Sequence, residues 1–285
     1  MDPVKERFLT IEKTKYYTIA SPAEVSSLYG QLKTYLGSGD QALTELEYMS
    51  LMRMLFDLTV YIGKDVEAEA LYKTFADRLG ENSPHLHVMK ATLIQINDKD
   101  AAAENYLTTL LKDSLEYDTD ALDYLLVSKK LLSIRRNSLT KEKFIRQVLD
   151  LVDKFPLDAE LWWFLAQEYF GLGQFEQASY CLEEVLCIHP FNYVAFGQLG
   201  QVLYYKALRD KKTNKTATLE ASLNNFLRSV ELSETFLKGW SFIANISKEL
   251  GKKELLELAK GKLMEIQKSD SQVDSATAKL ILEKL

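Results

Sequence analysis

The chain has 285 residues, of which 47% are apolar, a share that is typical of folded globular proteins and excludes a disordered chain. Its 35 basic and 41 acidic side chains give a net charge of −6, whereas a general nucleic-acid binder needs a surplus of Lys and Arg. Only 12 Gly and 5 Pro residues are present, which favours helices, because both residues interrupt them.

No apolar run approaches the ~18–20 residues that a membrane-spanning helix needs, so we expect no transmembrane segment. The N-terminal sequence MDPVKERFLT contains no signal-peptide core. Cys181 and Cys187 lie six residues apart on one expected helix and form no CxxC pattern. Together these features fit free thiols in a reducing compartment.

Residues 1–40 are expected to hold an N-terminal arm and a leading helix. The arm covers about residues 1–20. The helix starts at Ser21-Pro22, because Ser is a preferred cap and Pro fits the first turn, and it ends near Gly37.

Three pairs of helices are expected in the next part of the chain, within 49–80, 83–117 and 125–156. Each range contains two stripes of apolar residues with helical spacing. Gly63 separates the stripes of the first pair, and Pro156 closes the last pair.

Residues 158–190 show the clearest pattern of the chain. Gly171 and Gly173 separate two helical stripes, and a proline closes the second stripe. Seven residues are predicted to pack these two helices: Trp162, Leu165, Ala166, Tyr169, Ala178, Leu182 and Pro190. Their order over about 34 residues is the signature of a tetratricopeptide repeat, a helix–turn–helix unit that stacks into solenoids.

Two further repeats follow, at 193–229 and 240–263. A polar stretch without periodicity interrupts the first of them and predicts an inserted loop at about 209–217. The last segment is expected to form a capping helix over 269–285, because the end of a stack needs a polar outer face. We therefore predict an all-α fold, a right-handed tetratricopeptide-repeat solenoid of about six helix pairs over residues 41–268 with flanking N- and C-terminal helices.

No arrangement of reactive residues points to catalysis, a cofactor or a metal. His85 and His87 are two residues apart on an expected helix, whereas metal pairs on helices need a spacing of three or four. No phosphate-binding loop is present, because Gly171-Leu-Gly173 is a turn between helices. We therefore expect a protein that is not an enzyme and has no catalytic, cofactor-binding or metal-binding residues.

Partner binding is predicted on the concave face of repeats three to five, which a solenoid offers to extended segments. The candidate contacts are Lys129, Arg136, Trp163, Gln167, Phe170, Gln201 and Tyr204. Two interpretations of Trp163 stay open: it anchors a partner, or it packs against the neighbouring repeat.

A basic cluster stands out in this acidic chain. It consists of Lys129, Lys130, Arg135, Arg136, Lys141 and Lys143. The cluster is either a solvated face or a landing surface for an acidic peptide or anionic lipid headgroups.

The clearest repeat also resembles one particular family. The sequence Cys181-Leu-Glu-Glu184, followed by Pro190 and Asn192, is similar to a repeat of subunit 2 of the endoplasmic-reticulum (ER) membrane protein complex. The chain length, the lack of a membrane span and the interrupted repeat that follows are similar as well. The resemblance is sharp over about residues 157–205 and weakest in the N-terminal third.

This resemblance implies a non-catalytic scaffold subunit, in a fungal form, bound peripherally to the cytoplasmic face of the ER membrane within a hetero-oligomer. The implied partners are the membrane-embedded and cytosolic subunits of that complex, with no nucleic acid. In this family the solenoid holds cytosolic segments of membrane subunits, and the assembly inserts tail-anchored and multipass proteins into the bilayer.

Two alternatives remain from the sequence. One is a generic soluble tetratricopeptide adaptor or co-chaperone, although the groove positions Glu160 and Val194 lack the Lys and Asn residues that co-chaperones use as a clamp. The other is an enzyme, because Pro190-Phe-Asn192-Tyr193 resembles the repeats of protein prenyltransferase alpha subunits. That pattern occurs once here and does not recur.

Overall fold

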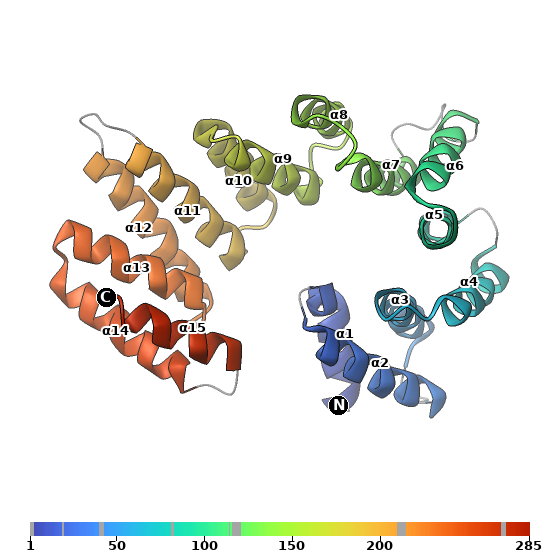
Figure 1. Cartoon of the computed structure of the whole chain (residues 1–285), viewed down its shortest axis with the longest axis horizontal. Coiled ribbons are helices and arrows are strands. Elements are labelled where there is room, and N and C mark those ends of the chain that lie inside the picture. The colour runs from blue at the N-terminus through green and yellow to red at the C-terminus, as the bar shows by residue number, and fades with distance from the viewer. Residues whose placement is uncertain are drawn as a thin grey trace. The chain divides into compact units, whose positions relative to one another are not determined.

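The computed structural model describes residues 3–18, 20–39, 43–80, 83–113, 115, 121–209, 215–268 and 272–285. Within these ranges the chain is helical and has no strands, which confirms the predicted all-α class (Figure 1). The α-helices and one 3-10 helix follow in this order: α1 (Pro3–Thr14), η1 (Tyr16–Thr18), α2 (Pro22–Gly37), α3 (Glu45–Tyr61), α4 (Asp65–Leu79), α5 (Pro84–Asp98), α6 (Asp100–Asp113), α7 (Leu122–Arg135), α8 (Lys141–Lys154), α9 (Ala159–Gly171), α10 (Phe175–Ile188), α11 (Tyr193–Arg209), α12 (Lys215–Leu232), α13 (Leu237–Leu250), α14 (Lys253–Gln267) and α15 (Gln272–Leu282).

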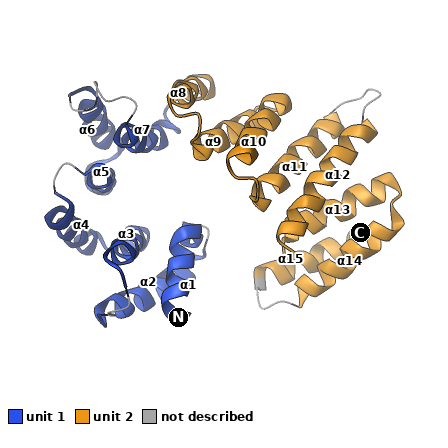
Figure 2. Cartoon of the chain, turned by 180° about the vertical axis from the view of Figure 1, so that it is seen from behind, with its two compact units in different colours: residues 1–138 blue, residues 139–285 orange. Residues whose placement is uncertain are grey.

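The chain divides into two compact units, residues 1–138 and 139–285 (Figure 2). Unit 1 contains α1 to α7, and unit 2 contains α8 to α15. The boundary falls in the turn between α7 and α8. Each unit has a hydrophobic core of its own.

The helices of the six predicted pairs are all present. In unit 1, α3 packs on α4 and α5 packs on α6; in unit 2, α9 packs on α10, α11 on α12 and α13 on α14. The remaining pair, α7 and α8, is divided by the unit boundary. The inserted loop that we predicted at about 209–217 is too long at its C-terminal end, because α12 already begins at Lys215; α11 ends at Arg209, and residues 210–214 lie outside the described ranges.

We predicted an N-terminal arm over residues 1–20, and the described residues of this range do not form one. Residues 3–14 form helix α1, and a 3-10 turn follows. Phe8 is 1% exposed, and its ring centroid lies 5.2 Å from that of Tyr35 in α2. Phe8 belongs to the hydrophobic core of unit 1, so α1 is part of that core. Burying such a ring stabilises a protein by about 1.5–3 kcal/mol.

The leading helix α2 begins where the sequence predicts. Ser21 accepts a hydrogen bond from the N–H of Glu24, and the Glu24 carboxylate accepts one from the Ser21 N–H at 2.8 Å. Pro22 occupies the first turn. Thr44 and Glu47 form the same capping box at the start of α3, so the first turn of each helix is well satisfied.

The predicted packing residues of α9 and α10 differ in burial. Four of them are at most 1% exposed: Leu165, Ala166, Ala178 and Leu182. Trp162 is half-buried, and its indole N–H donates to the Pro156 carbonyl at 2.8 Å while its ring meets Tyr180 edge-on. Tyr169 is half-buried, and Pro190 is exposed beyond the end of α10.

We predict that Ala178→Leu destabilises unit 2. Ala178 is fully buried on α10, which packs against α9. A larger side chain would overpack this contact at a cost of about 1–3 kcal/mol. Urea unfolding followed by circular dichroism measures the loss.

The matched control is Gln177→Leu, which adds an apolar side chain at an exposed position of the same helix. It should change the free energy of unfolding by at most about 0.5 kcal/mol. Equal stability of the two variants would contradict the repeat register.

Candidate protein-binding surface

Four aromatic side chains of unit 2 form a row that we call the aromatic ribbon. Its members are Phe170 from α9, Tyr204 and Tyr205 from α11, and Phe242 from α13. The ring centroids of Phe170 and Tyr205 are 5.7 Å apart. Tyr204 lies 5.7 Å from Tyr205 and 5.2 Å from Phe242. All three contacts are edge-on, an arrangement that aromatic rings prefer. Because α9, α11 and α13 belong to successive repeats, the ribbon connects three repeats.

The repeat period explains the position of the ribbon. Phe170 and Tyr204 are 34 residues apart, so they occupy the same position in consecutive repeats. Phe242 stacks on Phe226 of α12, with 4.7 Å between the ring centroids, and this contact fixes its orientation. Tyr205 is 40% exposed and the other three rings of the ribbon are half-buried. The ribbon therefore offers ordered aromatic surface to solvent.

Tyr204 adds a hydrogen-bond donor to this surface. Its burial raises the pKa of the phenol, and the nearby Glu249 carboxylate raises it further, while Lys215 opposes the effect. Lys215 forms an ion pair with Glu249. The Tyr204 hydroxyl therefore stays protonated at neutral pH and can donate to a partner.

Lys238 is a basic residue of this face that the sequence analysis missed. It lies at the start of α13, and its ammonium donates to Gln198 Oε1 of α11 at 2.8 Å. Burial lowers the pKa of Lys238, and no carboxylate of the described residues forms an ion pair with it. Lys238 precedes Trp240 by two residues, just as Glu160 precedes Trp162. Glu160 is a groove position of its repeat, so the repeat register places Lys238 at the equivalent groove position.

The seven predicted partner-binding residues are divided between the units. Five lie in unit 2: Phe170 and Tyr204 in the ribbon, and Trp163, Gln167 and Gln201, which are half-buried on α9 and α11. Lys129 lies on α7 in unit 1, and Arg136 caps the end of that helix. The role of all seven in partner binding stays a prediction, and both interpretations of Trp163 remain open.

Two members of the basic cluster are engaged inside unit 1. The ammonium of Lys130 donates to Gln95 Oε1 at 2.6 Å, and burial lowers its pKa. Arg135 Nε donates to Glu104 Oε1 at 2.7 Å. These contacts connect α7 to α5 and α6, so Lys130 and Arg135 do not contribute to a landing surface.

The two histidines of α5 make separate hydrogen bonds. Arg53 donates from Nη1 to His85 Nδ1 at 2.8 Å, and because arginine only donates, this imidazole is neutral. His87 Nδ1 lies 2.8 Å from the Tyr106 hydroxyl. Burial lowers the pKa of both imidazoles. Arg53 lowers that of His85 further, Lys90 lowers that of His87, and Asp123 opposes both shifts.

The described residues contain no group of three or more His, Cys, Asp or Glu side chains placed to hold a metal ion. Cys181 and Cys187 are both free thiols. Cys181 is buried, which raises the pKa of its thiol to about 12, whereas Cys187 is exposed. In the described part of the chain, no helix combines the length and the apolar character needed to span a bilayer.

Comparison with known proteins identifies the family. No family model matches the chain. The chain is 51% identical over 289 residues to ER membrane protein complex subunit 2 of Saccharomyces cerevisiae, covering 100% of this chain and 99% of that relative. The chain belongs to the ER membrane protein complex subunit 2 family. It is also 26% identical to TPR repeat protein oca3 of Schizosaccharomyces pombe, over 85% of this chain and 79% of that relative.

Two solved structures show the same fold. One is the MamA RS-1 ArsTM double mutant, with a TM-score of 0.52 and 12% identity over 67% of this chain and 98% of that chain. The other is YrrB, described as a TPR protein with an unusual peptide-binding site, with a TM-score of 0.50 and 13% identity over 73% of this chain and 97% of that chain. At these identities the likeness concerns the fold alone, and it confirms the predicted tetratricopeptide class.

We predict that Lys238→Met leaves the free energy of unfolding unchanged or raises it. A half-buried ammonium without a carboxylate is poorly solvated, so its removal relieves a cost of burial that offsets the hydrogen bond lost by the buried Gln198. Lys206→Met is the control, because Lys206 forms an ion pair with Glu176 at 3.2 Å. Urea unfolding at pH 7 measures both variants. A loss of more than about 1 kcal/mol in Lys238→Met would show that Lys238 is structural.

We predict that stability falls as the pH is lowered from 7.5 to 5. The pKa values of His85 and His87 are lowered in the folded chain, so the unfolded chain takes up these protons first. The free energy of unfolding is therefore highest above the ordinary histidine pKa and falls through the folded pKa. The double variant His85→Asn/His87→Asn, measured by urea unfolding at each pH, should show a smaller fall. An identical slope in both proteins would exclude the two histidines as the cause.

Proposed function

We propose that the chain is a non-catalytic scaffold subunit of an ER membrane protein complex. In this proposal it sits peripherally on the cytoplasmic face of the membrane and holds cytosolic segments of membrane subunits. The assembly then inserts tail-anchored and multipass proteins. The observation that carries the proposal is the 51% identity to the Saccharomyces cerevisiae subunit over the whole of this chain.

The architecture of unit 2 supports a scaffold role. A repeat array offers a continuous surface along several helix pairs, so one partner segment can contact successive repeats. The aromatic ribbon supplies rings of the type that dominate binding energy at protein interfaces. Lys238 lies on α13, the helix that contributes Phe242 to the ribbon, and supplies a positive charge that a partner carboxylate would neutralise.

Replacement of the yeast relative tests the proposal. A tagged copy of this chain replaces subunit 2 in Saccharomyces cerevisiae, and the complex is isolated in mild detergent and quantified by mass spectrometry. Insertion of a tail-anchored reporter into microsomes is measured in parallel. A fixed set of ER membrane proteins at stoichiometric amounts, with restored insertion, is expected. Recovery of soluble chaperones alone would instead favour the generic adaptor.

We predict that the double variant Phe170→Ala/Tyr205→Ser weakens this association. Truncating a central aromatic contact at an interface costs more than about 1 kcal/mol, so recovery of the partners should fall at least about 5-fold. Phe191→Ser is the control, because Phe191 is 74% exposed in unit 2 and lies outside the ribbon. Equal recovery with both variants, at equal melting temperature, would remove the ribbon from the interface.

A further inference from the structure

Unit 1 contains a groove between α3, α4 and α5 that the proposed function does not use. Its volume is about 610 Å³, which is in the range of pockets that hold ligands. We call it the α3–α5 groove. Its apolar wall consists of Leu46, Met49, Phe75, Leu79 and Met89, and Arg53 and Arg78 are the two basic residues that line it.

The apolar wall is open to solvent in an ordered part of the fold. Leu46 is 81% exposed and Leu79 is 44% exposed, although both are large apolar residues. Leu46 lies in the first turn of α3, which the Thr44–Glu47 capping box holds in place. Exposed apolar side chains gathered on rigid elements are typical of an interaction site rather than of ordinary surface.

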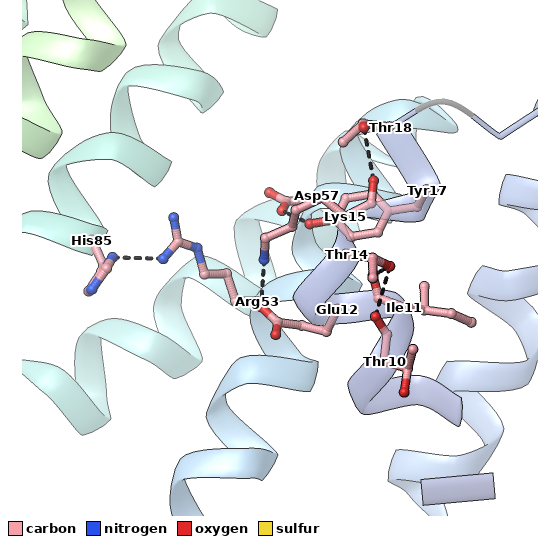
Figure 3. Close-up of polar contacts among 10 residues, drawn as sticks. All are labelled: Thr10, Ile11, Glu12, Thr14, Lys15, Tyr17, Thr18, Arg53, Asp57 and His85. Carbon is pink, nitrogen blue, oxygen red and sulfur yellow. Dashed lines mark hydrogen bonds and ion pairs between the residues drawn. The ribbon is translucent and has the colours of Figure 1, made fainter. Parts of the chain in front are cut away.

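The charge of Arg53 decides what kind of partner fits. Its guanidinium donates to the neutral imidazole of His85 at 2.8 Å, as Figure 3 shows. Among the described residues, no carboxylate forms an ion pair with Arg53. Asp57 lies one turn further along α3 and accepts a hydrogen bond from the Tyr17 hydroxyl at 2.9 Å. Burial raises the pKa of Asp57 and the charge of Arg53 opposes this rise, so Asp57 compensates Arg53 in part without an ion pair. The arginine therefore lines an apolar groove with its charge only partly compensated.

The second arginine is differently engaged. Arg78 forms an ion pair with Glu45 at 2.7 Å, and the Glu45 side chain is 76% exposed. The lining thus carries two guanidinium groups and one carboxylate. Its net charge is positive, in a chain whose total charge is −6. This charge complements an acidic ligand.

We propose that the α3–α5 groove binds a short segment of a partner protein that combines neighbouring apolar side chains with a carboxylate. The apolar side chains enter between Leu46, Met49 and Phe75. The carboxylate replaces His85 as the acceptor of the Arg53 hydrogen bond, because charge-assisted hydrogen bonds are stronger than those to neutral acceptors. A bilayer is a poorer occupant, because binding to anionic lipid relies on several basic residues in a cluster. The α3–α5 groove lies within unit 1, and its binding of such a segment does not require that the chain works within the ER complex.

Peptide selection on the purified full-length chain tests this proposal. A random library of peptides about twelve residues long, enough for one recognition segment, is panned against the chain. The selected peptides are then synthesised and titrated by fluorescence anisotropy. We expect enrichment of peptides that carry an Asp or Glu beside two apolar residues.

Two variants locate the binding. Leu46→Ser, at an exposed position that tolerates the change, should raise the dissociation constant at least about 10-fold. The matched control Leu122→Ser, at a leucine that is 71% exposed elsewhere in unit 1, should leave it unchanged. Arg53→Glu should also abolish binding, and exchange of the peptide carboxylate for a lysine should restore it.

Each other outcome overturns the proposal. Selected peptides without acidic residues, or with affinities that Leu46→Ser and Arg53→Glu do not change, exclude this site. A concentration-dependent dimer that Leu46→Ser converts to a monomer identifies a second copy as the occupant. Binding to vesicles of phosphatidylserine and phosphatidylcholine that Leu46→Ser abolishes, without groove-dependent peptides, identifies the membrane instead.

Discussion

Close contact between paired helices is the constraint on which the rest of each unit depends. A side chain added at Gly200 of α11 would place its Cβ 2.8 Å from the ring of Phe226 in α12, closer than such atoms pack. Because nothing intervenes, the Ser222 hydroxyl donates to the Gly200 carbonyl at 2.6 Å. Ala166 of the preceding repeat lies 34 residues earlier and is buried as well. These small residues allow α9 to pack closely on α10 and α11 on α12, and α9 and α11 carry three of the four rings of the aromatic ribbon.

The sequence predicts this packing well where the repeat is regular. Ala166 and Ala178 are recognisable because the spacing of a repeat is local and the contact admits only small residues. The burial of Phe8 was not predictable in the same way. It is the one aromatic residue of a short helix in which charged residues alternate with apolar ones, and it is buried by tertiary contacts such as that with Tyr35 of α2. The N-terminal helix therefore depends on tertiary packing rather than on a local pattern.

The two candidate binding surfaces also differ in whether a local sequence pattern predicts them. Phe170 and Tyr204 were predicted as surface residues because they recur at the repeat period. Phe242 has no such register, and it joins the ribbon because Phe226 supports it. The α3–α5 groove was missed entirely, since its residues come from three helices and no spacing relates Leu46 to Phe75 or Met89. A sequence pattern predicts which residues lie on the same face within a repeat, whereas the residues that line a groove depend on how successive helices pack.

Both surfaces contain groups that the isolated chain satisfies poorly. Lys238 is a half-buried ammonium that donates to a neutral amide, and Arg53 is a guanidinium that donates to a neutral imidazole. Carboxylates at these positions would have stabilised the free chain more, because charge-assisted hydrogen bonds are stronger. A partner that supplies them binds the folded state alone, so binding raises the apparent stability of the unit it contacts. Folding and partner binding are thereby linked, through residues whose charge is better satisfied in the complex than in the free chain.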